Sequence, residues 1–252
     1  MILEFSIIVI VISFLLGYID STLGMGYGTA LAPILLLLGF NPLQVVPAIL
    51  LSQLIIGLFI ALLHNKVGNV NFGAGKGHFR IASVLTACSI AGVFAAVFIA
   101  ISLPTIILKA YIGILVLVIG LVMLFGKNKQ YAFSWKNIIG LGILSAFNKG
   151  ISGGGYGPVV VNGQILSGVD GKNAIGITTL AKGLTCLAGV IAYLLIKSMV
   201  DWSLVPYLLI GALVSLPFSA LTVKKIKVKK LKLAVGIFTV ILGVVTLINI
   251  LL

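Results

Sequence analysis

The chain alternates long apolar runs with short breaks that carry glycine, proline or charge. Ten apolar segments follow one another, at residues 6–23, 28–40, 43–64, 79–101, 104–126, 136–151, 157–168, 171–196, 203–222 and 233–252. Most of them approach the roughly 20 residues that an α-helix needs to cross the hydrocarbon core of a bilayer. Residues 28–40 and 157–168 are shorter, and at about 1.5 Å per residue each reaches only about 20 Å. We therefore expect each of these two segments to be the returning arm of a re-entrant hairpin.

Composition agrees with this pattern. Of the 252 residues, 61% are hydrophobic and only 8% are charged. This is typical of an all-α polytopic membrane protein and leaves no room for a sizeable soluble domain. The first residues, MILEF, include Glu4 and no lysine or arginine, so they do not resemble a secretory signal. We expect the first segment to belong to the mature fold.

The chain repeats itself at an offset of 129 residues. This offset pairs the glycines and the tyrosine of GMGYG, at 24–28, with those of GGGYG, at 153–157. One gap later, VNF at 70–72 pairs with VDW at 200–202, and near the end of each half Gly113 and Gly120 pair with Gly236 and Gly243. Because the matches keep the same order, we predict two homologous halves, 1–126 and 136–252, joined by a linker at 127–135.

Lysine and arginine in short loops favour the cytoplasm, and the chain has a net charge of +13. The run KKIKVKK marks the loop at 224–232 as cytoplasmic, and counting crossings backwards puts the loops at 65–78, 127–136 and 169–172 on the same side. Each half then has one hairpin, 6–40 or 136–168, and three crossings, which makes the halves inverted-topology repeats. Both termini are predicted to be extracytoplasmic at the plasma membrane. The lysines indicate orientation and anionic lipid near Lys224–Lys232 rather than nucleic acid.

In an inverted repeat of this kind, the two glycine tips should meet near the middle of the bilayer. Irregular backbone at that depth persists only where protein or a water-filled cavity satisfies its polar groups, and in secondary transporters such breaks form the substrate site. Helices that start near Gly28 and Gly157 would direct unpaired N–H groups and the positive ends of their dipoles at the break. The pattern favours an anion as the ligand, with close helix packing as the alternative role for the glycines.

Two lysines strengthen the interpretation as an anion site. Lys149 lies four residues before Gly153, and Lys182 lies near the middle of 171–196, where an uncompensated charge costs at least about 2.5–3.5 kcal/mol. Asp20, the repeat-mate of Lys149, cannot neutralise both lysines. The excess positive charge indicates a small anionic substrate, and a purely structural Asp20–Lys149 pair beside a neutralised Lys182 is the alternative. Asp20 is also a candidate carrier of a coupled proton.

The predicted substrate-binding residues surround these charges. They are Gly24, Gly26, Gln53, Asn148, Lys149, Ser152, Gly153, Gly154, Gly155, Gly157, Thr178 and Lys182. Tyr27 and Tyr156 either pack the tips or gate them. The cysteines and histidines have no CxxC or metal-ligand spacing, so we expect neither a metal nor another cofactor besides a coupled proton.

Each half opens with a G-x-G-x-G break after a short polar stretch, YIDST or FNKGIS, and each carries a V-[ND]-aromatic loop, VNF or VDW. These features resemble the TauE/SafE sulfite exporter family. The resemblance implies a bacterial or archaeal plasma-membrane permease that exports sulfite, sulfonates or related sulfur oxyanions, coupled to the proton gradient. Since Met25 stands where the second copy has Gly154, the second tip is expected to make the larger contact with substrate.

Two other functions stay open on the sequence alone. An intramembrane enzyme or redox relay would need paired cysteines, metal ligands or a nucleophile with its base, and the positions of Cys88, Cys186, His64 and His78 do not favour one. A non-transporting membrane subunit would bind a partner through the loop at Lys224–Lys232. The sequence does not define the oligomeric state.

Overall fold

The computed structural model describes residues 2–73, 77–125, 133–197, 202–222 and 228–251, and these ranges are helical apart from short connections. The helices are α1 (Ile2–Leu23), α2 (Tyr27–Leu37), α3 (Pro42–Val67), α4 (His78–Ser102), α5 (Thr105–Phe125), α6 (Trp135–Ser152), α7 (Tyr156–Leu166), α8 (Gly171–Lys197), α9 (Val205–Thr222) and α10 (Val228–Leu251). Each coincides with one of the ten predicted apolar segments, with ends that differ by a few residues. The all-helical class is therefore confirmed.

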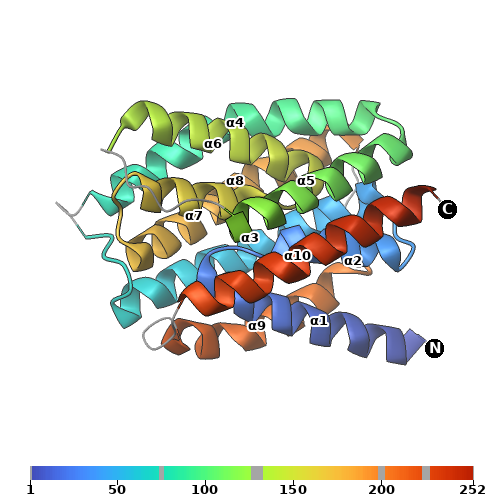
Figure 1. The fold of residues 1–252 in the computed structure, drawn as a ribbon, viewed down its shortest axis with the longest axis horizontal. Coiled ribbons are helices and arrows are strands. Elements are labelled where there is room, and N and C mark those ends of the chain that lie inside the picture. Colours follow the sequence, from blue (N-terminus) through green and yellow to red (C-terminus); the bar gives the residue numbers. More distant parts are fainter. Residues whose placement is uncertain (1, 74–76, 126–132, 198–201, 223–227, 252) are drawn as a thin grey trace.

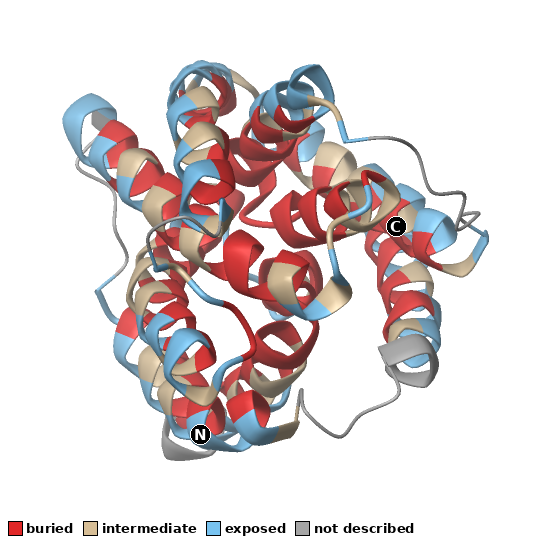
Figure 2. Ribbon diagram, turned by 90° about the vertical axis from the view of Figure 1, so that its left-hand side faces the viewer, coloured by how far each residue is buried: buried red, intermediate tan, exposed pale blue. Residues whose placement is uncertain are grey.

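Within the described ranges, seven helices are long and apolar enough to cross a membrane: α1, α3, α4, α5, α8, α9 and α10. Figure 2 shows that buried residues face the interior of the bundle and that exposed residues lie at its periphery. Many of these exposed residues are large and apolar, such as Phe98, Leu195 and Phe218. An apolar periphery of this kind suits lipid rather than water, so the protein is a multi-pass membrane protein.

The two short helices, α2 and α7, have 11 residues each. In Figure 1, α2 returns toward the end of the bundle at which α1 begins, as expected for a hairpin. Both termini lie at this end, and α10 begins at the opposite end. α1 belongs to the seven helices that are long enough to cross, although its last turn is buried inside the bundle.

The halves of the chain are interleaved rather than side by side. α1 packs along α9, α4 packs along α6, and the central α3 packs along α8. α5 and α10 also pack together, and glycines allow their close approach: a Cβ atom at Gly120 would lie 2.7 Å from the backbone nitrogen of Val240, and one at Gly243 would lie 2.6 Å from that of Leu117. Small residues at such contacts permit the backbone proximity that stabilises helix pairs in membranes.

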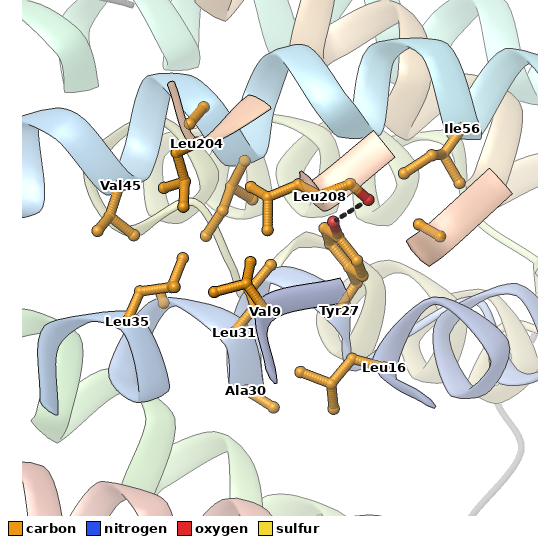
Figure 3. Packing of buried hydrophobic residues seen from close by; sticks show 14 of the residues in the cluster. Val9, Leu16, Tyr27, Ala30, Leu31, Leu35, Val45, Ile56, Leu204 and Leu208 are labelled. Carbon is orange, nitrogen blue, oxygen red and sulfur yellow. Dashed lines mark hydrogen bonds between the residues drawn. The ribbon is translucent and has the colours of Figure 1, made fainter. Parts of the chain in front are cut away.

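Apolar packing holds α2 at the centre of one side of the bundle. Leu31 and Leu35 of α2 belong to a buried cluster with Val45 of α3 and Leu208 of α9 (Figure 3). Tyr27, at the start of α2, belongs to the same cluster and donates its hydroxyl hydrogen to the carbonyl of Leu208 at 3.4 Å. The break that precedes α2 is thus fixed from behind by packing against two long helices.

Candidate functional site

Two breaks in the helices, after α1 and after α6, form the core of the site. Their glycines have left-handed backbone conformations at matching positions: φ is +73° at Gly24 and +70° at Gly153, and +123° at Gly26 and +82° at Gly155. Residues with side chains rarely adopt such angles, so glycine is required there. The two breaks therefore share their sequence and also their pattern of backbone reversal.

The two tips cross in direct contact. A Cβ atom added to Gly28 would overlap with the carbonyl oxygen of Gly153, and one added to Gly157 would overlap with that of Gly24. A Cβ atom at Gly154 would lie 2.8 Å from the backbone nitrogen of Thr29. Since a single methyl group would separate the tips, these glycines keep the two backbones together.

A small polar cavity lies at this crossing. It is lined by Asp20, Gly26, Gly28, Thr29, Gln53, Lys149, Gly154, Gly155, Tyr156, Gly157, Pro158 and Lys182. Its volume of about 10 Å³ leaves room for roughly one water molecule. Every charged residue that we predicted for the site lies in this lining.

Four of these side chains form a polar cluster: Asp20 on α1, Gln53 on α3, Lys149 on α6 and Lys182 on α8. Asp20 Oδ2 accepts a hydrogen bond from Lys182 Nζ at 2.5 Å, forming an ion pair, and one from Gln53 Nε2 at 3.5 Å. Lys149 Nζ donates to Gln53 Oε1 and, at 2.5 Å, to the carbonyl of Gly153. The ion pair thus joins Asp20 to Lys182, not to Lys149 as one alternative from the sequence proposed.

The repeat relates the members of the polar cluster in pairs. Asp20 and Lys149 are equivalent at the offset of 129 residues, and so are Gln53 and Lys182. The contact from Asp20 to Lys182 therefore has its counterpart in the contact from Lys149 to Gln53. With all groups ionised, the cluster carries two positive charges and one negative charge. Lys149 donates to two neutral acceptors, whereas Lys182 is paired with a carboxylate.

Asp20 also occupies the start of α2. Its Oδ1 accepts a hydrogen bond from the backbone N–H of Tyr27 at 3.2 Å, so the protein's own carboxylate lies at the positive end of this helix. At the second tip, the N–H of Gly155 donates to Thr29 Oγ1 and that of Gly154 donates to Ser152 Oγ, both at 3.1 Å. The equivalent of Asp20 there is Lys149, so the second tip has a cation where the first has an anion.

The other predicted residues lie around this centre. Asn148 packs against Gly155 and accepts a hydrogen bond from the Tyr111 hydroxyl at 2.6 Å. Thr178 accepts one from Gln164 at 2.7 Å and lies behind α7, outside the cavity lining. Gly24, Ser152 and Gly153 belong to the breaks without lining the cavity.

The two candidate gating tyrosines have buried hydroxyls. The Tyr27 hydroxyl lies 2.9 Å from Ser13 Oγ, and the Tyr156 hydroxyl lies 3.3 Å from Ser89 Oγ. Each hydroxyl thus attaches the start of a short helix to a long helix behind it. Gating by these residues stays a prediction.

Three residues that line the cavity were not among the predicted site residues: Gly28, Thr29 and Pro158. Gly28 belongs to the first glycine motif, whereas Thr29 and Pro158 are repeat-mates, each one residue beyond the G-x-G-x-G break. The signal that would have found them is their place in the first turn of a helix whose N-terminus points at the other tip. Thr29 uses its hydroxyl to satisfy an N–H group of that other tip.

Two further hydrogen bonds, formed by residues that the repeat relates to each other, attach the helices that precede the breaks to their neighbours. His64 Nε2 lies 3.0 Å from the carbonyl of Ser21, and the Tyr193 hydroxyl donates to the carbonyl of Gly150 at 3.0 Å. Ser21 and Gly150 directly follow Asp20 and Lys149 in sequence. The long helices α3 and α8 therefore fix the backbone beside each charged residue.

Comparison with known proteins identifies the family. The model of the family described as sulfite exporter TauE/SafE matches residues 9–246. A probable membrane transporter protein from Bacillus subtilis (strain 168), YtnM, is 25% identical over 244 residues, which cover 92% of this chain and 79% of that protein. No solved structure matches the chain. With a match over nearly its whole length, the chain belongs to the sulfite exporter TauE/SafE family, a family of membrane transporters.

Proposed function

We propose that the protein is a secondary transporter that exports a small sulfur oxyanion, sulfite or an organosulfonate, across the plasma membrane. The observation that carries this proposal is the polar cluster: two buried lysines and one carboxylate at the crossing of two glycine-lined helix breaks. A buried cation without a carboxylate of its own is costly in a membrane interior, and an anionic ligand compensates for it. The family description supports the same class of substrate.

The anion binds beside Lys149 and the first turn of α7. At the first tip, Asp20 already fills the place of an anion, since it bonds both the N–H of Tyr27 and Lys182. At the second tip, Lys149 takes the equivalent position, and only 1% of its surface is exposed. A bound sulfonate would accept hydrogen bonds from Lys149 in place of the neutral oxygen of Gln53. The sulfonate would add the attraction between opposite charges to a hydrogen bond that Lys149 otherwise donates to a neutral oxygen.

The site is built from two tips, one from each half of the chain, and this arrangement supports a transport mechanism. A cavity with room for about one water molecule is too small for a sulfonate, so the tips must separate for substrate to enter. We infer that the halves act as inverted repeats, and that rocking one against the other opens the site to each side of the membrane in turn. The matched glycine conformations of the tips and the matched helix pairs, α1 with α9 and α6 with α4, support this inference.

Asp20 provides a group that can couple transport of the anion to movement of a proton. The anion and a proton would occupy the site in turn: after the anion has left on the outer side, Asp20 takes up a proton and releases Lys182, and it loses this proton on the inner side before the next anion binds, so that the proton moves in the opposite direction to the anion. The 2.5 Å contact between Asp20 and Lys182 is the interaction that this exchange would break. Export would then be driven by the proton gradient.

The proposal is tested by Lys149→Met in proteoliposomes loaded with sulfite. This change keeps an unbranched side chain, one atom shorter and without charge, and leaves both partners of the ion pair between Asp20 and Lys182 in place. Loss of a charge-assisted hydrogen bond weakens binding by about 10- to 100-fold, so we expect KM to rise by at least that factor or flux to vanish. Lys109→Met, which removes a half-buried lysine from α5, is the matched control and should transport normally.

Flux is measured with and without an imposed pH gradient. Wild-type flux of sulfite that exceeds the flux in protein-free vesicles, and that rises with the gradient, supports a coupled transporter. Equal flux in wild type and Lys149→Met, with both proteins folded, would contradict the assignment of the anion site. Sulfite flux that does not respond to the gradient would contradict the coupling alone.

A further inference from the structure

A second cavity adjoins the polar site. It lies between α1, α2 and α10 and is lined by Leu16, Ile19, Gly26, Ala30, Ala234, Val235 and Phe238, and we call it the side pocket. Its volume is about 220 Å³, and its lining residues are apolar. Gly26 lines both the side pocket and the polar cavity. The two spaces therefore share one lining residue, Gly26.

The side pocket is open at its outer edge. Ala234 and Phe238 of α10 are exposed, whereas Leu16, Ala30 and Val235 are buried at its inner wall. A Cβ atom at Gly26 would meet Ile19 at 3.2 Å and Val235 at 3.9 Å, so the backbone of the tip forms part of the wall. An apolar group that enters from the bilayer side can thus reach the tip without crossing a polar surface.

In the other half of the protein, several of the residues that the repeat relates to the side pocket are in contact with one another. Here the last helices of the two halves are related as Gly113 is to Gly236, an offset of 123 residues, which pairs Leu115 with Phe238. Leu115 lies 3.4 Å from a Cβ atom built at Gly155. Tyr111 and Asn148, the mates of Ala234 and Ile19, are hydrogen-bonded to each other at 2.6 Å. The same position is therefore filled by a tyrosine and an asparagine in one half and left open by an alanine and an isoleucine in the other.

We propose that the side pocket binds the apolar chain of an anionic substrate whose head group is held at the polar cluster. This inference rests on the proposed function and narrows its organosulfonates to those that carry an apolar hydrocarbon chain. The shared wall at Gly26 brings the chain and the head group of one molecule within reach of the two spaces. A cavity of about 150 Å³ lined by apolar side chains holds benzene, so the side pocket accommodates a chain of about six carbon atoms.

The proposal is tested by competition in proteoliposomes. Linear sulfonates from methanesulfonate to octanesulfonate compete with labelled sulfite, and binding should tighten about fourfold for each methylene group buried. We expect this gain between three and about six carbon atoms, followed by a plateau when the pocket is full. Hexanol and hexyltrimethylammonium, which have the chain without the anionic head group, should not compete.

Two variants change the pocket in opposite directions. Ala234→Tyr places in α10 the residue that α5 already has at the equivalent position, and it should bring the ratio of hexane- to methanesulfonate affinity close to one. Phe238→Ala widens the mouth and should move the plateau to longer chains, which keeps the test valid if Ala234→Tyr fails to fold. Leu233→Tyr introduces the same side chain at an exposed neighbouring residue and is the matched control.

The outcomes separate the side pocket from the transport site. If methanesulfonate competes with sulfite but affinity does not change with chain length, the side pocket is not a substrate site, and a lipid acyl chain fills it instead. An identical chain-length series in wild type and Ala234→Tyr would overturn the proposal in the same way. If wild-type protein transports no sulfite and binds no methanesulfonate, the proposed function itself fails.

Discussion

Glycine has two distinct roles at the tips, and single residues show the difference. Gly24 and Gly153 are needed for their positive φ, whereas Gly28 and Gly157 have ordinary backbone angles and are needed because a carbonyl oxygen of the opposite tip occupies the place of a side chain. Met25 departs from the glycine pattern, and its side chain packs in a buried apolar cluster.

Gly157→Ala tests the contact between the tips. Its methyl group would overlap with the carbonyl oxygen of Gly24, so we expect the free energy of unfolding to fall by about 1–3 kcal/mol and sulfite flux to drop more than tenfold. Gly140→Ala is the control, because nothing lies within 4 Å of the added atom in this exposed helical position. The control should gain up to about 1 kcal/mol. Denaturation in mixed micelles measures both, and equal stability of the two variants would contradict tip contact.

The charged residues of the site could be identified from the sequence, but their pairing could not. Lys149, Lys182 and Asp20 could be identified because an ionisable group within an apolar segment costs free energy in the membrane, and such groups usually belong to functional sites. Which lysine pairs with Asp20 depends on the crossing of α1 with α8, a contact between residues 162 positions apart. Gln53 takes the place between Asp20 and Lys149 that a direct ion pair would have required.

At the scale of elements, the long helices α3 and α8 hold the broken ones. His64 of α3 and Tyr193 of α8 bond the carbonyls of Ser21 and Gly150, one residue beyond Asp20 and Lys149. Carbonyls near the end of a helix lack an intrahelical partner, so these bonds satisfy the backbone where the helix stops. The same bonds keep each charged side chain at the depth of the tips.

Tyr193→Phe tests this role of α8. The carbonyl of Gly150 would lose its buried partner, so we expect the free energy of unfolding to fall by about 1–3 kcal/mol. Without this hydrogen bond the backbone next to Lys149 is less well fixed, so the KM for sulfite should also rise while the maximal rate changes less. Tyr207→Phe, at a partly exposed tyrosine of α9, is the control and should stay within about 0.5 kcal/mol of wild type. An unchanged KM in Tyr193→Phe would limit its role to stability.

At the scale of the whole molecule, interleaving makes each half incomplete alone. α1 of the first half packs mainly against α9 of the second, and α6 of the second half packs mainly against α4 of the first. The core therefore needs both halves. The polar cluster draws two members from each half, Asp20 and Gln53 from the first and Lys149 and Lys182 from the second. A relative movement of the halves therefore changes the site directly.

The orientation of the whole molecule in the membrane is tested by cysteine labelling. Thr105, at the start of α5, lies at the end of the bundle that holds both termini, and Lys172, at the start of α8, lies at the other end (Figure 1). In a chain with Cys88→Ala and Cys186→Ala, we expect an impermeant maleimide to label Thr105→Cys in intact cells. Lys172→Cys should react only after permeabilisation, because basic loops favour the cytoplasm. The reverse pattern would contradict the predicted topology.

The apolar pattern and the glycine repeat by themselves determined the ten helices, the two breaks and the family to which the chain belongs. These features follow from local rules: a segment in lipid must satisfy its own backbone, and only glycine adopts certain angles. The tertiary structure decided the pairing of Asp20 with Lys182, the crossing of the tips through Thr29 and the side pocket next to Gly26. These depend on contacts between distant segments, and the two sides differ because Ala234 leaves open in one half the space that Tyr111 fills in the other.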